Sequence, residues 1–143
     1  MLENPKVNIK IKLAALWASV TFCYLYGDYF ELYTPDKVNS LITGENNLDS
    51  PIKLLIASIF LAISSVMVAA SVILKSKINR ILNIVFGTLF TLMMVIIGIV
   101  STNEWYLFYV FLAFLESIIT AIIVWYAWKW PKEQKQLKIV SNG

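Results

Sequence analysis

Histidine is absent from this sequence of 143 residues, and cysteine occurs only once, as Cys23. The absence of histidine removes the commonest general base and the commonest haem or metal ligand. A lone cysteine excludes an internal disulfide, and within an apolar run it is typical of a small buried side chain. Gly-x-Ser-x-Gly motifs and phosphate-binding loops are missing as well. We therefore expect no catalytic residues, no metal site and no cofactor, and we predict that the protein is not an enzyme.

Charged residues are also scarce, at 15% of the chain against about 25% in a typical soluble domain. Hydrophobic residues make up 59% and stand in long blocks. The net charge of +3 would suggest an acidic partner for a soluble protein, but here the positions of the charges matter more than their sum. We expect the lipid bilayer as a partner, and no nucleic acid.

All four prolines lie outside four long apolar runs, as expected of residues that cannot donate a helical hydrogen bond. The runs cover about residues 13–33, 54–74, 81–100 and 105–128. A helix needs about 20 apolar residues to cross a bilayer core of about 30 Å. The sequence therefore predicts an all-α membrane protein: a four-transmembrane-helix bundle that forms one domain over residues 1–143, with an outer loop at 34–53.

Basic residues are distributed unevenly between the two sides of this arrangement. With the N-terminus inside, ten lysines and arginines lie on the cytoplasmic side, and only Lys37 and Lys53 lie outside. Cytoplasmic loops of membrane proteins carry such an excess. We therefore expect both termini to be cytoplasmic and the protein to be a multi-pass protein of a bacterial inner membrane.

The outer loop contains a short apolar pattern at helical spacing, formed by Val38, Leu41 and Ile42 ahead of Gly44. This pattern predicts a short helix lying on the membrane surface. The acidic segment at 45–49 lacks the glycine and the spacing of a calcium loop, so we interpret it as a solvated loop.

Small and polar residues form one stripe along each apolar run, at steps of three and four residues. Such residues share a helix face and mark helix contacts in lipid, so we expect the four stripes to face one another. The stripes are Ala14, Trp17, Thr21, Tyr24, Asp28 and Glu31; Ser58, Ala62, Ser65 and Ala69; Asn83, Gly87, Thr91, Met94 and Gly98; and Tyr109, Ala113, Glu116, Thr120 and Ala127.

Glu116 and Asp28 are not explained by packing alone. Glu116 falls near the middle of the fourth run, where a charge costs roughly 2.5–3.5 kcal/mol on insertion scales. Asp28 lies roughly 7 Å inside the outer boundary of the first run at 1.5 Å per residue, and Glu31 lies one turn further out. Two interpretations of Glu116 stay open. It is either a neutral carboxyl bonded to Tyr24, Ser65 or Thr120, or a functional group that meets water or a cation.

Two classes of function fit these features. In the first, a proton- or cation-linked transporter or channel-like protein, Glu116 is the coupling site, Tyr24 and Thr120 bond to it, and Asp28 and Glu31 form an outer vestibule. Because four short helices enclose little volume, this function predicts a homo-oligomer. The alternative is a binding or structural module: an accessory subunit, or a site for a lipid, a quinone or another hydrophobic small molecule. The aromatic outer half of the first run and the aromatic start of the fourth would form its pocket, with Asp28 as a polar floor.

Three stretches resemble a known family. They are Tyr26-Gly27-Asp28 with Glu31, Leu32, Tyr33 and Pro35; Asn79-Arg80-Ile81-Leu82-Asn83-Ile84; and Trp125-Tyr126-Ala127-Trp128-Lys129-Trp130-Pro131. Over essentially its whole length the chain is similar to a family of small bacterial four-span membrane proteins catalogued as a domain of unknown function. In that pattern glycine usually follows the proline, whereas this chain has Asp36. The resemblance implies a four-span fold and a membrane location, and it implies no activity.

Overall fold

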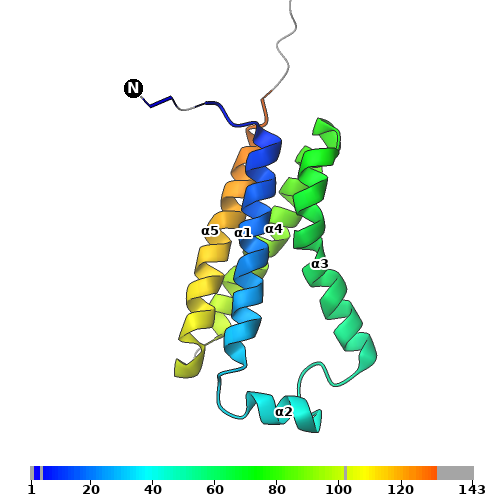
Figure 1. Ribbon diagram of the computed structural model, residues 1–143, viewed down its shortest axis with the longest axis vertical. Coiled ribbons are helices and arrows are strands. Elements are labelled where there is room, and N and C mark those ends of the chain that lie inside the picture. The colour runs from blue at the N-terminus through cyan, green and yellow to red at the C-terminus, as the bar shows by residue number, and fades with distance from the viewer. Residues whose placement is uncertain (1, 4, 102, 132–143) are drawn as a thin grey trace, which may run out of the picture.

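The computed structural model describes residues 2–3, 5–101 and 103–131, and this part of the chain contains helices and no strands (Figure 1). The α-helices are α1 (Ile9–Glu31), α2 (Lys37–Thr43), α3 (Pro51–Ile73), α4 (Ser76–Val100) and α5 (Leu107–Trp128), and the 3-10 turn η1 (Glu104–Tyr106) leads into α5. Four of them (α5 taken together with η1) are long and apolar enough to cross a membrane. The predicted all-helical chain with four candidate spans is confirmed.

The ends of the helices are set by capping residues, a proline and a glycine. Asn8 caps α1, since its Oδ1 accepts a hydrogen bond from the main-chain N–H of Lys10 at 2.9 Å. Ser50 caps α3 in the same way, and Pro51 occupies the first helical turn, where its missing N–H costs nothing. Gly44 ends α2 with a φ of 76°, a left-handed conformation that glycine adopts freely. The predicted short helix before Gly44 is thereby confirmed.

The four long helices are antiparallel to their chain neighbours and pack unequally (Figure 1). α5 packs along both α4 and α1, and α3 packs on α1 and diverges from it toward α2. The buried residues of α3, Ser64, Met67 and Ser71, all belong to its second half. The core is centred on Trp17, Phe90 and Ile123, which are fully buried.

Three of the four predicted stripes face this core, and that of α3 does not. Ser58, Ala62, Ser65 and Ala69 are all exposed, so their prediction as contact residues was wrong. α3 carries a second run of small residues on another face, which includes Ser64 and Ser71. This face packs against α1, and the Thr21 hydroxyl donates a hydrogen bond of 3.1 Å to the Ser64 hydroxyl. Both faces have small residues at helical spacing, so composition alone does not distinguish them.

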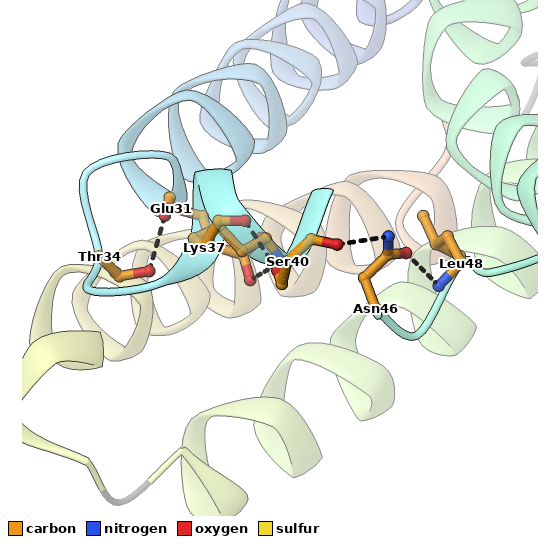
Figure 2. A network of polar contacts seen from close by, with 6 residues as sticks. All are labelled: Glu31, Thr34, Lys37, Ser40, Asn46 and Leu48. Carbon is orange, nitrogen blue, oxygen red and sulfur yellow. Dashed lines mark hydrogen bonds and ion pairs between the residues drawn. The ribbon is translucent and has the colours of Figure 1, made fainter. Parts of the chain in front are cut away.

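The end of α1 is tied to α2 by a short polar network (Figure 2). Lys37 Nζ lies 2.7 Å from Glu31 Oε1, and the Thr34 hydroxyl donates to the main-chain carbonyl of Glu31 at 2.8 Å. Between them Asp36 turns the chain with a φ of 61°, and it is the one non-glycine residue at positive φ in the described part of the chain. This is the position at which the resemblance implies glycine, and the left-handed backbone gives the physical reason.

The opposite end of the molecule, which we call the basic end, contains the start of α1, the α3–α4 connection and the end of α5. Two cations there cap the carbonyl ends of neighbouring helices. Lys10 Nζ donates to the Leu74 carbonyl at 2.6 Å, and Arg80 Nε donates to the Ala127 carbonyl at 3.2 Å. Cations at helix C-termini satisfy the last carbonyls and interact favourably with the helix dipole.

Candidate functional site

Glu116 lies on the inner face of α5, where its side chain is 3% exposed. Its Oε2 atom is buried and has no hydrogen-bond partner among the described residues. A buried carboxyl oxygen without a hydrogen-bond partner is costly, so packing alone does not account for this atom. Glu116, predicted to lie near the middle of an apolar helix, therefore faces the interior of the bundle.

A small cavity lies between α1, α4 and α5 at Glu116. Its wall includes Tyr24 and Gly27 from α1, Met94 from α4 and Tyr109 from α5. The Tyr24 hydroxyl oxygen is the second buried polar atom here that has no hydrogen-bond partner in the described chain. The cavity volume of ≈ 10 Å³ is about what one water molecule requires. The two residues that carry these unpaired atoms therefore line the same space of one-water size.

Of the partners predicted for Glu116, only Tyr24 lies at its carboxyl group. The Thr120 hydroxyl donates instead to the main-chain carbonyl of Glu116 at 2.8 Å, and its oxygen lies 2.7 Å from the Thr91 hydroxyl of α4. Thr120 therefore links α4 to α5. Ser65 is exposed on α3 and does not line the cavity. Sequence reasoning did not identify Tyr109 and Gly27 as parts of the site, although Tyr109 stood in the predicted stripe.

Asp28 and Glu31 continue from the cavity toward the α2 end. Asp28 is exposed on α1, about one turn beyond Tyr24. Glu31 is half-buried and forms the ion pair with Lys37, so its charge is already balanced by a residue of α2. The outer vestibule of Asp28 and Glu31 stays a prediction, and neither residue lines the Glu116 cavity.

A buried amide network lies on the other side of the core. Trp17 Nε1 donates to Asn83 Oδ1 at 2.7 Å, and Asn83 Nδ2 donates to Asn79 Oδ1 at 2.6 Å. Asn79 in turn donates to the carbonyl of Ser71, so the network joins α1, α4 and α3. The signal in the sequence is a pair of asparagines four residues apart within an apolar run, a spacing that places both on one face.

Phe90 separates the cavity from the amide network. Along α4 it lies between Asn83 and Met94, which are about 16 Å apart at 1.5 Å per residue. Its ring centroid lies 5.8 Å from that of Tyr24 and 5.6 Å from that of Trp17, and it stacks on Phe60 of α3 at 5.1 Å. Glu116 therefore has an aromatic layer between it and the basic end.

A second pocket lies at the α2 end and is aromatic. Its volume is ≈ 250 Å³, and its wall consists of Phe30, Tyr33, Thr34, Trp105 and Phe108. The end of α1 and the start of α5 thus form a pocket as predicted, but Thr34 rather than Asp28 supplies its polar wall. The Tyr33 hydroxyl is hydrogen-bonded to that of Tyr29 at 2.7 Å, which raises the pKa of the Tyr33 phenol.

Comparison with known proteins agrees with the resemblance found in the sequence. No curated protein and no solved structure matches the chain. A family model matches residues 4–137, which include α1 to α5 and all the residues that line the Glu116 cavity. The chain belongs to this family, which is described as a family of unknown function, DUF6326.

Proposed function

We propose that the protein spans a bacterial inner membrane four times, with both termini in the cytoplasm, and that it moves protons across the membrane through Glu116. The observation that carries this proposal is the buried Oε2 of Glu116, which faces a water-sized cavity without a partner among the described residues. Ionisable groups buried within membrane spans mark ion pathways and proton relays. The uneven distribution of lysine and arginine supports the orientation.

The size of the cavity favours a proton over a larger cargo. A space of ≈ 10 Å³ admits about one water molecule, which is enough to exchange a proton with a carboxyl group. A cation such as calcium takes six to eight oxygen ligands. Here the wall offers one carboxyl group and the phenols of Tyr24 and Tyr109. A lipid or a quinone is too large for the Glu116 cavity.

The layers of the molecule suggest how transport is controlled. Tyr109 lines the cavity on the side of the α2 end, Asp28 lies on α1 one turn beyond Tyr24, and Phe90 lies between the cavity and the basic end. In this proposal Glu116 gains a proton from the outer side, and displacement of the Phe90 ring gives it access to the inner side. Phe60, the stacking partner of Phe90, lies in the first half of α3, which has no buried residues, and in this proposal motion of that half releases the ring.

Proton flux in liposomes tests the proposal. Purified protein is reconstituted with a pH-sensitive dye inside, and a pH gradient is imposed with a potassium potential clamp. We expect Glu116→Gln to abolish the flux of the wild-type protein. Glu104→Gln is the matched control, since it makes the same chemical change at an exposed residue of η1 and should retain the flux. Wild-type flux that persists in a folded Glu116→Gln variant would overturn the proposal.

Filling the cavity provides a second test that leaves the carboxyl group in place. A Cβ at Gly27 would lie 3.6 Å from the Tyr109 ring and 3.7 Å from Leu112, which are ordinary contact distances. We therefore expect Gly27→Ala to fold normally and to reduce the flux severalfold, because its methyl group occupies space that a water needs. An unchanged flux would contradict the cavity as part of the path.

The aromatic pocket favours a second candidate function, the binding of a hydrophobic small molecule at the α2 end. Its ≈ 250 Å³ is smaller than most sites for drug-sized ligands, so a small ring compound suits it better than a lipid. A tryptophan fluorescence titration with a water-soluble quinone analogue tests this function. We expect Trp105→Leu to abolish the response, whereas a response retained in that variant would exclude this pocket.

A further inference from the structure

A groove at the basic end has no part in the proposed proton path. It lies between the segment that leads into α1 and the end of α5, and its volume is ≈ 570 Å³. Its wall contains the three cations Lys6, Lys12 and Lys129 and the rings of Trp125 and Tyr126, and no acidic residue from the described part of the chain lines it. A groove with several ammonium groups and no carboxylate is electrostatically suited to an anion.

Two of the three groove lysines lie over aromatic rings, and none of the three forms a salt bridge with a described residue. Lys12 Nζ lies 5.3 Å from the centroid of the Tyr126 ring, and Lys129 Nζ lies 4.7 Å from that of Trp125. An exposed contact of this kind contributes only about 0.5–1 kcal/mol, and it leaves the positive charge of the ammonium group in place. The salt bridges in the described part of the chain, at Lys37 and Lys53, both lie at the opposite end of the molecule.

The neighbouring cations of the basic end have a different role. Lys10 and Arg80 donate to carbonyls at the ends of α3 and α5, so they are committed to helix capping. The two helices that border the groove also carry exposed apolar side chains, among them Ile11 at 56% and Trp128 at 67% exposure. The groove therefore combines ammonium groups with an exposed apolar surface directly beside them.

We propose that this groove binds the phosphate headgroup of an anionic phospholipid, with the lysines on the phosphate and the acyl chains along the exposed apolar surface of α1 and α5. The inference rests on the membrane location proposed above, and it is independent of Glu116. Basic pockets at the cytoplasmic ends of membrane helices bind such headgroups, and tryptophan and tyrosine favour the headgroup level. A free phosphate ion would use the lysines but not the apolar surface.

The test measures binding of phosphatidylglycerol to the purified full-length protein in a neutral detergent, by native mass spectrometry, with phosphatidylcholine as the zwitterionic reference. Each lysine near a phosphate contributes about fivefold in affinity, so Lys12→Gln with Lys129→Gln should weaken phosphatidylglycerol binding roughly 25-fold. Lys75→Gln with Lys77→Gln is the matched control, because it removes two exposed cations from the same end without touching the groove. We expect the control to change the affinity by less than about threefold, since screening weakens distant charges.

Further arms keep the proposal falsifiable. Lys6 lies ahead of α1, so Lys6→Gln leaves the helices intact. This variant should weaken phosphatidylglycerol binding about fivefold, and it tests the groove even where the double variant folds poorly. Inorganic phosphate at a hundredfold excess should leave the bound phosphatidylglycerol in place. Equal losses in the two double variants, equal binding of phosphatidylcholine, or displacement by inorganic phosphate would each overturn the proposal.

Discussion

Asp36 has a backbone conformation that few side chains adopt. Its φ of 61° lies in the left-handed region, and its side chain makes no capping hydrogen bond to α2. We expect Asp36→Gly to raise the free energy of unfolding by about 0.5–1 kcal/mol and Asp36→Val to lower it by about 1–2 kcal/mol. Thermal unfolding in detergent, followed by circular dichroism, measures both. A less stable glycine variant would contradict the assignment of strain to this residue.

Trp17 anchors the amide network to α1 through its one polar atom. Trp17→Phe removes the donor to Asn83 Oδ1 and leaves that oxygen buried, so we expect a loss of about 1–3 kcal/mol. Trp105→Phe is the matched control, because Trp105 is 61% exposed and should lose less than about 0.5 kcal/mol. Equal effects in the two variants would show that the indole N–H contributes nothing measurable.

For single residues, the sequence predicts which side chains are buried better than it predicts their hydrogen-bond partners. The burial of Glu116 follows from its place in an apolar run, and that of Asn83 from its spacing along α4. Which hydroxyl bonds to which carboxyl group depends on how far each helix is rotated, and no residue pattern within one helix determines that rotation. The Thr120 hydroxyl therefore bonds to a main-chain carbonyl and to Thr91 rather than to the Glu116 carboxyl group.

Close packing of α4 on α5 depends on a single glycine. A Cβ at Gly87 would lie 2.8 Å from Val124 Cγ2 and 3.4 Å from Ile123 Cγ2, so the side chains of α5 would have to move. We expect Gly87→Ala to destabilise the protein by about 1–3 kcal/mol. The matched variant Gly98→Ala meets only Ala113 Cβ, at 3.8 Å, and should be neutral or stabilising by up to about 1 kcal/mol. Thermal unfolding of the pair decides, and a stable Gly87→Ala variant would contradict this packing.

Helices as elements are well predicted by the length of the apolar runs and by the prolines and glycines at their ends. Their contact faces are predicted where one face alone is small or polar, as in α4 and α5. In α3 the exposed stripe of Ser58 and Ala62 is as rich in small residues as the buried face of Ser64 and Ser71. The choice between them is made by the side chains of α1 and α4 that face α3, which the sequence of α3 does not contain.

The whole molecule has two chemically distinct ends, and the orientation that we propose is inferred from them. We expect single cysteines, placed in a Cys23→Ala background, to react with a membrane-impermeant thiol reagent on one side only. A cysteine at Asn47 should be labelled in intact cells, and one at Lys77 only after lysis. Labelling of Lys77→Cys in intact cells would contradict the proposed orientation and indicate the opposite one. The predicted homo-oligomer is a separate question, and the mass of the detergent-solubilised particle tests it.

Infrared spectroscopy of the protein in oriented membranes tests the role of Glu116 most directly. A neutral carboxylic acid absorbs apart from a carboxylate, and Glu116→Gln identifies the band of this residue. Our account predicts a neutral-acid band that is absent from Glu116→Gln and that falls and returns reversibly as the outer pH is cycled, because Glu116 exchanges its proton with that side. A band that stays constant over the whole range in which the protein is folded would contradict the account and identify Glu116 as a packing residue.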